Sequence, residues 1–196
     1  MPRTYSTKVP VLPGPGFLVV DTETTGLARY DRVIEIALVH LSPCGSIEST
    51  FATVLKGDGS PGCRAAREKH GISEKQLRRA PAFEAIVEGL FHALNSERII
   101  VAHNESFDRR MINQELSRIG WPTMRKRLLC TMGLASALGY GGKLSLAKAV
   151  NLLSIPHHPT HAACEDAVAT AHLLVELQRR HPQDFARHVT SIGYSL

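Results

Sequence analysis

The sequence of 196 residues has few aromatic side chains and no long apolar run. Aromatic residues make up 6% of the chain, with one tryptophan, which argues against an extended platform for stacking bases. No stretch approaches the ~20 consecutive apolar residues that a membrane-spanning helix needs. The proline-rich start, MPRTYSTKVPVLPGPG, is too polar for a secretory signal. We therefore expect a cytoplasmic protein with no membrane partner.

Cysteine is scarce as well, and the four cysteines include no CxxC pair. Their scattered positions predict reduced thiols rather than a disulfide framework. Basic residues outnumber acidic ones, with 23 Lys and Arg against 18 Asp and Glu. The formal net charge is +5 and the pI is near 9.2. A basic balance favours an anionic partner such as nucleic acid, although charge alone does not establish one.

The length fits one domain with a substantial core. Residues 1–16 carry four prolines and are expected to be an extended, loosely attached N-terminal segment. Residues 17–181 contain the regular apolar patterns and form the expected domain. Residues 182–196 are assigned to a short C-terminal tail.

The order of apolar patterns predicts an α/β fold. Strands are expected at 17–21, 33–41 and about 48–55, and the short gaps between them indicate an antiparallel meander. Two further strands, 99–102 and 128–130, alternate with helices, which implies a mixed five-stranded sheet flanked by helices. The helical patterns cover residues 63–70, 73–79, 82–95, 106–119, 131–138, 144–152 and 163–180.

The segment VVDTETTGL, residues 19–27, ends an apolar run with two acids. Side chains of a strand alternate between its faces, so Asp21 and Glu23 point the same way. Two carboxylates ~4 Å apart repel by roughly 4 kcal/mol at an effective dielectric constant of about 20. The pair is therefore unfavourable unless a cation lies between its members. Surface acids that diverge into water remain an alternative for these two residues taken alone.

The segment VAHNESFD, residues 101–108, follows the fourth expected strand. Asp108 falls in the first turn of the next helix, where an acid favours the helix dipole whatever its role. His103 and Asn104 leave the same strand end, which supports a site there. Phe107 is better explained as a packing residue.

The segment HPTHAACEDAVATAHLL, residues 158–174, predicts a helix that packs on the core, with Asp166 in its early turns. His161 lies five positions earlier, about 140° away on a regular helix. Both side chains can serve one site only if His161 belongs to the preceding loop, which Pro156 and Pro159 favour.

In this order and at these distances, the three segments resemble those of the DEDDh exonucleases. That family includes the proofreading subunit of bacterial replicative DNA polymerase, ribonuclease T and oligoribonuclease. The likeness runs from about Phe17 to Leu177 and includes HGIS at 70–73, CT at 130–131 and LSLAKAV at 144–150. It implies a ribonuclease H-like fold and a 3′→5′ exonuclease that hydrolyses single-stranded DNA or RNA from its 3′ end and releases nucleoside 5′-monophosphates.

The resemblance also implies roles for individual residues. Two divalent cations, Mg²⁺ or Mn²⁺, would be held by Asp21, Glu23, Asp108 and Asp166, and His161 would be the general base. The 3′-terminal nucleotides would lie near Thr24, Gly26, Leu27, His103, Asn104 and Phe107. Glu105 stands where the family often has a small residue.

Two other functions stay open on the sequence alone. One is a nucleic-acid-binding adaptor that keeps the fold without turnover, and the other is a metal-dependent phosphatase of small esters. The partners expected are single-stranded 3′ ends, while association with a polymerase or in a homodimer stays open. Neither the preference for DNA or RNA nor the biological role is specified.

Overall fold

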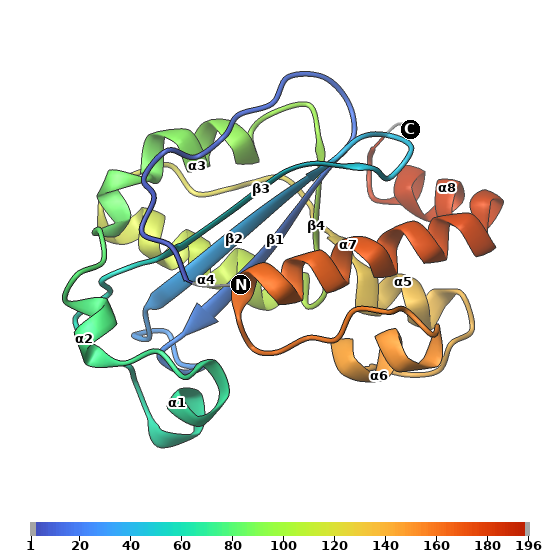
Figure 1. Cartoon of the computed structure of the whole chain (residues 1–196). Helices are drawn as coiled ribbons and strands as arrows, with labels where there is room; N and C mark the ends of the chain where they lie inside the picture. The colour runs from blue at the N-terminus through green and yellow to red at the C-terminus, as the bar shows by residue number, and fades with distance from the viewer. Residues whose placement is uncertain (1–2, 195–196) are drawn as a thin grey trace.

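A computed structural model describes residues 3–194 and places helices on both faces of a mixed five-stranded sheet (Figure 1). The strand order is β3-β2-β1-β4-β5. The first three strands pair antiparallel, whereas β4 runs parallel to β1 and β5 parallel to β4. This confirms the expected meander and mixed sheet. The strands are β1 (Phe17–Thr24), β2 (Val33–Leu41), β3 (Ile47–Val54), β4 (Ile99–Ala102) and β5 (Leu129–Cys130).

The helices follow the expected order with one addition near the C-terminus. They are α1 (Arg64–His70), α2 (Glu74–Leu77), α3 (Val87–Leu94), α4 (Glu105–Arg118), α5 (Thr131–Ala137), α6 (Leu146–Leu152), α7 (Ala163–Arg180) and α8 (Pro182–Ser191). The single helix expected at 82–95 is instead a 3₁₀ turn, Phe83–Ala85, followed by α3. With the helix interrupted here, the side chains of both Phe83 and Ile86 are buried in the core. Tertiary packing thus overrides the continuous helical pattern of the sequence.

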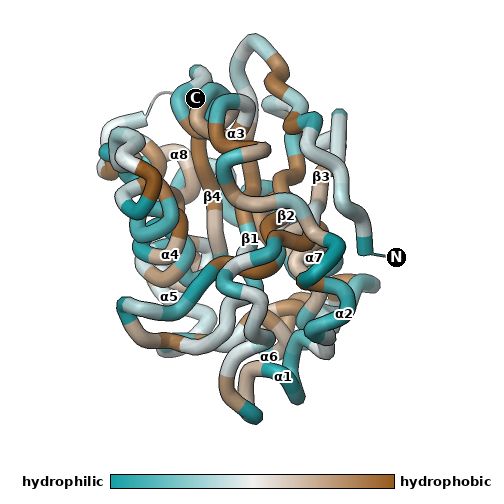
Figure 2. Tube along the Cα trace, turned by 90° about the vertical axis from the view of Figure 1, so that its left-hand side faces the viewer, coloured by the Kyte–Doolittle hydropathy of each residue, from teal (hydrophilic) through white to brown (hydrophobic). Residues whose placement is uncertain are grey.

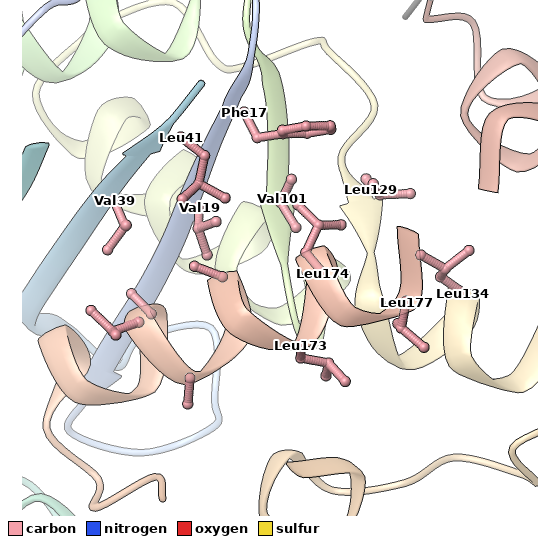
Figure 3. Packing of buried hydrophobic residues seen from close by; sticks show 14 of the residues in the cluster. Phe17, Val19, Val39, Leu41, Val101, Leu129, Leu134, Leu173, Leu174 and Leu177 are labelled. Carbon is pink, nitrogen blue, oxygen red and sulfur yellow. The ribbon is translucent and has the colours of Figure 1, made fainter. Parts of the chain in front are cut away.

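Alternation along the strands builds two separate apolar layers. Phe17 and Val19 pack with α5, α6, α7 and α8, whereas Leu18 and Val20 pack with α3 and α4. Figure 3 shows three leucines of α7 lying over the first of these faces. In Figure 2 the tube of β1 and β4 is brown, as expected for strands covered on both sides. Each residue of β1 therefore faces either α7 or α4, and this parity decides where the acids point.

The N-terminal segment contains no helix or strand from residue 3 to 16, yet it is tied to the sheet. Tyr5 pairs with Thr53 of β3, and the buried Arg98 donates hydrogen bonds to the carbonyls of Leu12 and Pro13. These bonds hold the segment more firmly than its prolines suggest. Residues 1–2 lie outside the described part of the chain.

The expected tail contains helix α8, and its sequence pattern was missed because the helix is short and polar overall. Phe185 is buried against Phe17, with ring centroids 6.1 Å apart, and Val189 is buried beside it. Residues 195–196 are outside the described range. Among the helices of residues 3–194, none is long and apolar enough to cross a membrane.

Candidate active site

The exposed end of β1 distributes its polar side chains between the two helical layers. Parity puts Asp21 and Glu23 on the face that α7 covers, and Thr22 on the face that α4 covers. The strand is longer than the sequence indicated, so both acids belong to β1 itself. They are consequently fixed by the sheet and cannot both turn into water.

Asp108 reaches the same end of β1 from the first turn of α4. It is buried, and its Oδ1 accepts a 2.8 Å hydrogen bond from the hydroxyl of Thr22. Helix α4 begins directly after β4, the parallel neighbour of β1, so the strand ends and the helix start meet at one edge. This contact fixes the carboxyl of Asp108 against β1.

The third segment supplies Asp166 from the first turn of α7 and His161 from the loop before it, as the sequence required. Asp166 Oδ1 accepts the backbone N–H groups of Thr160 at 2.8 Å and His161 at 3.2 Å. His161 has a φ of +56°, a left-handed conformation that few residues other than glycine adopt. One donor atom each of Glu23, His161 and Asp166 lies within 4.8 Å of the others.

One cavity of about 420 Å³ joins these groups. Every residue that the sequence suggested for the site lines it: Asp21, Glu23, Thr24, Gly26, Leu27, His103, Asn104, Phe107, Asp108, His161 and Asp166. The structure thus brings together residues separated by up to 145 positions, counted from Asp21 to Asp166. None of the expected site residues lies elsewhere.

Burial raises the pKa of all four carboxyls, since protein replaces the water that would stabilise their charged forms. The pKa of Asp21 is raised well above its usual range, first by burial and then by the charges of Asp108 and Glu23. Burial, followed by the charges of Asp166 and Glu35, raises the pKa of Glu23 to about 8. Burial raises the pKa of Asp108 to about 7. The cluster therefore retains protons near neutrality unless a cation replaces them.

The residues expected near the substrate differ in their exposure and in whether their polar atoms are already hydrogen-bonded within the protein. Leu27 is 76% exposed, and the ring of Phe107 lies under the guanidinium of Arg110 at 5.3 Å from its centroid. His103, by contrast, uses both ring nitrogens inside the protein, at 2.9 Å from the Thr131 hydroxyl and 3.0 Å from the Leu144 carbonyl. Its ring shapes the wall of the cavity and has no nitrogen to spare for a ligand.

Glycine at position 26 has a steric explanation. A Cβ there would lie 2.6 Å from a carboxylate oxygen of Asp31, which caps the loop by accepting bonds from Thr25 and the Ala28 N–H. The loop that carries Leu27 is therefore closed by Asp31. Gly26 permits this closure because it has no Cβ to meet Asp31.

The sequence interpretation missed Glu35, Lys69 and His70. Lys69 and His70 line the cavity from the end of α1, and Glu35 is buried beside Glu23 in β2. The HGIS likeness at 70–73 gave no role to His70, which bonds to the Pro61 carbonyl and the Ile72 N–H. For Glu35 a signal was present, because it is an acid in the middle of an otherwise apolar strand, VIEIALVHL.

The fold and its acid-lined strand end define a ribonuclease H-like exonuclease architecture. The structure of E. coli exonuclease I in complex with a dA16 oligonucleotide superimposes with a TM-score of 0.78 at 20% identity, over 90% of this chain and 43% of that one. The chain belongs to the exonuclease family whose model, RNase_T, matches residues 18–174. A structure of exonuclease X with 5′ overhanging duplex DNA is 30% identical, with a TM-score of 0.68 over 85% of this chain and 93% of that chain.

Relatives by sequence include longer proteins. A DNA polymerase III subunit epsilon-like protein of Rhodobacter capsulatus is 32% identical over 188 residues, which are 92% of this chain and 26% of the relative. The 3′-5′ exonuclease DinG of Staphylococcus haemolyticus is 29% identical over 171 residues, 85% of this chain and 18% of that protein. The chain thus spans about a quarter or less of the length of these two relatives.

Proposed function

We propose that this chain is a 3′→5′ exonuclease that releases nucleoside 5′-monophosphates from single-stranded 3′ ends, with DNA as its main substrate. In this proposal two divalent cations, Mg²⁺ or Mn²⁺, are held by Asp21, Glu23, Asp108 and Asp166. The general base is His161. The preference for DNA rests on the similar proteins, which include DNA polymerase III proteins and exonuclease X in complex with DNA.

The observation that carries the proposal is the meeting of four carboxyls around one cavity, two buried (Asp108 and Asp166) and two half-buried (Asp21 and Glu23), with their pKa values raised. Such an arrangement costs stability in the absence of a cation and fits a site built to hold one. The donors are carboxylate oxygens, which suit Mg²⁺ and Mn²⁺ better than zinc. The chemistry that two such ions supply is activation of water and neutralisation of the departing 3′ oxygen.

In this proposal His161 takes the proton of the attacking water. Its ring is exposed to the cavity near Glu23 and Asp166, while its backbone N–H is held by Asp166. Imidazole is the side chain best suited to accept a proton at neutral pH. Its loop position allows adjustment when a substrate enters.

A hollow of about 620 Å³ beside the site supports a polymeric substrate. It is lined by Arg29, Arg109, Arg110 and Arg118 together with neutral polar residues of α4, and within the described part of the chain no acid lines it. Its residues Arg29 and Arg110 lie close in sequence to Leu27 and Phe107 of the cavity. Phosphates of the strand upstream of the 3′ end are the natural ligands of such a surface. A small phosphate ester has no further phosphates that could contact these arginines.

The test is digestion of 5′-labelled single-stranded DNA, single-stranded RNA and duplex oligonucleotides with Mg²⁺ or Mn²⁺. A ladder that shortens from the 3′ end supports the proposal, and faster loss of the single-stranded DNA supports the substrate preference. Internal cuts contradict it. Hydrolysis of a chromogenic monoester without any ladder would identify a phosphatase, and tight binding without cleavage would identify an adaptor.

Variants separate the site from the rest of the protein. Asp21→Asn abolishes the ladder if the acids hold the ions. Asp58→Asn is the matched control, because Asp58 is an exposed loop acid that accepts the Ser60 N–H. His161→Ala is expected to retain Mn²⁺ binding while turnover falls, which distinguishes a base from a ligand. Equal losses in the Asp58 and Asp21 variants would contradict the assignment.

A further inference from the structure

A fifth carboxyl, Glu35, adjoins the four proposed ligands without being one of them. It is 2% exposed and lies opposite Glu23 in the antiparallel pairing of β1 with β2. Cross-strand partners point to the same face of a sheet. Glu35 consequently faces α7, as Asp21 and Glu23 do, and adds a negative charge next to the cluster.

One oxygen of Glu35 is used to begin helix α7. Glu35 Oε2 accepts the backbone N–H of Ala163, the first residue of that helix, at 3.2 Å. The preceding residue, Ala162, has no side chain that can cap the helix. The first N–H groups of a helix lack internal partners, so the buried acceptor fixes where α7 starts. Asp166 follows three residues later on the same helix, so its position depends on that start.

The other oxygen of Glu35 is paired with Arg3 of the N-terminal segment. Arg3 Nε lies 3.1 Å from Glu35 Oε1. The same guanidinium donates to the carbonyls of His70 and His161, the latter at 3.4 Å. Residue 3 is held there because the next residue, Thr4, accepts the Val54 N–H at 2.9 Å. His161, whose φ is positive, is thus held through its N–H by Asp166 and through its carbonyl by Arg3.

From these contacts we propose that Arg3 and Glu35 form a positioning pair for the metal site. Glu35 fixes the start of α7 and with it Asp166, while Arg3 cancels the charge of Glu35 and holds the His161 loop. Because the charges of Arg3 and Glu35 cancel, the negative charge that attracts the divalent cations comes from the four acids alone. This inference rests on the proposed function only in that it takes those four acids to be the ligands.

Another ion pair with one buried member provides the comparison. Arg98, also almost fully buried, pairs with Glu48 of β3 at 2.7 Å and donates to the Leu41 carbonyl at 2.7 Å. It lies at the opposite end of β1, and within the described residues its hydrogen bonds go to Leu12, Pro13, Phe17, Leu41 and Glu48, none of which belongs to α7 or the acid cluster. A purely structural role for Arg3 and Glu35 would make the two pairs behave alike, so Glu48→Gln is the matched control for Glu35→Gln.

The first test is the affinity for Mn²⁺, obtained from the melting temperature as Mn²⁺ is titrated into the full chain. Removing one negative charge by Glu35→Gln is expected to weaken binding by roughly 3- to 10-fold, and Arg3→Gln to strengthen it by a similar factor. The double variant should return near the wild-type affinity. Glu48→Gln should leave it unchanged. Shifts of the same sign in both single variants, or none, would overturn the charge part of the proposal.

The second test is hydrogen exchange of the peptide that covers residues 159–166, followed in the same variants. Glu35→Leu removes the acceptor of the Ala163 N–H, so exchange should accelerate by tenfold or more, while the amide oxygen of Glu35→Gln should keep it slow. Turnover at saturating Mn²⁺ should fall in the leucine variant and survive in the glutamine variant. Equal exchange in the two variants overturns the positioning role. Should Glu35→Leu not fold, the affinities of the glutamine variants decide.

Mn²⁺ affinity and hydrogen exchange can both be measured without turnover. The exonuclease proposal and the Arg3–Glu35 proposal can therefore fail independently. Mn²⁺ binding with no cleavage of any oligonucleotide would remove the exonuclease proposal and leave the pair testable. A normal 3′ ladder, with Arg3 and Glu35 variants indistinguishable from Glu48→Gln, would remove the pair and leave the exonuclease.

Discussion

Charged side chains at the two ends of β1 have opposite surroundings. At the Phe17 end, the guanidinium of Arg98 is almost fully buried and satisfied by carbonyls and by Glu48. At the other end, Asp21 and Glu23 meet further carboxyls and have their pKa values raised. One end of β1 therefore borders a cation whose charge is compensated, and the other end carries acids that have no cation to pair with among themselves.

This difference separates structure from function. A buried charge with all its partners stabilises the protein or at least does not destabilise it, whereas a cluster of like charges costs free energy. Proteins tolerate such a cost mainly where a ligand relieves it. Changes at the Arg98 end should therefore lower stability and leave turnover intact, whereas changes at the acid end should lower turnover without lowering the stability of the metal-free protein.

Asp21→Asn should give the largest effect at the acid end. Turnover is expected to fall by at least roughly 10²–10³-fold, the loss seen when one preorganised electrostatic group is removed. The metal-free protein should melt at a higher temperature at alkaline pH, because asparagine cannot acquire the charge that burial and the neighbouring acids disfavour in Asp21. Turnover and melting of the purified variant check both parts. A melting temperature below that of the wild type would contradict the idea that the cluster is strained.

Arg98→Met should show the opposite pattern. The free energy of unfolding is expected to fall by about 2–3 kcal/mol, less than for a fully buried pair because Glu48 reaches water. That corresponds to a melting temperature lower by roughly 4–12 °C at this chain length. Turnover per folded molecule should match the wild type below the transition. A specific loss of turnover would show that the two ends are coupled.

The pH dependence of stability sharpens the comparison further. The pKa of Glu23 is about 8 and that of Asp108 about 7 in the folded chain, above their ordinary values of 4.5 and 3.8. Between these limits the folded state holds more protons than the unfolded state, so the stability of the metal-free protein falls as pH rises through that window. From pH 5 to pH 8.5 we expect a loss of at least about 1.4 kcal/mol, one pKa unit.

Thermal melts in a chelator at several pH values measure this slope. Mg²⁺ should stabilise the protein more at pH 8.5 than at pH 5, because there it displaces fewer protons. Arg98→Met should lower every melting temperature without changing the slope, whereas Glu23→Gln should flatten it. A flat profile for the wild type would show that the acids are not strained.

Part of this site was predictable because it follows from parity and order alone. Asp21 and Glu23 share a face by the period of a strand, and His161 could join Asp166 only from a loop, which is where it lies. The mixed sheet followed from the short early gaps and the later alternation of helices and strands. These features depend on local pattern and connectivity, both of which are present in a single sequence.

Other features required knowledge of what packs across the chain. The role of Glu35 depends on Arg3 and Ala163, which lie 32 and 128 positions away. Helix α8 depends on Phe185 meeting Phe17, and nothing near Phe185 indicates that contact. The resemblance implies that His103 lies near the substrate, but nothing in its own segment indicates the hydrogen bonds of its ring nitrogens to Thr131 and Leu144.

Leu27→Ala should give the smallest effect and test how far the acid end extends toward the substrate. Leu27 is 76% exposed, so its truncation is expected to change stability by less than about 0.5 kcal/mol. If the exposed side chain packs against the terminal base, KM should rise by roughly 3- to 10-fold with kcat nearly unchanged, since losing contact with an apolar group costs about 1 kcal/mol. Steady-state kinetics on a short oligonucleotide measure the split, with Tyr30→Ala, another exposed side chain of the same loop, as the control. Equal KM values for the wild type and Leu27→Ala would show that the terminal nucleotide base of the substrate does not pack on Leu27. The functional surface would then not extend from the acids to this loop.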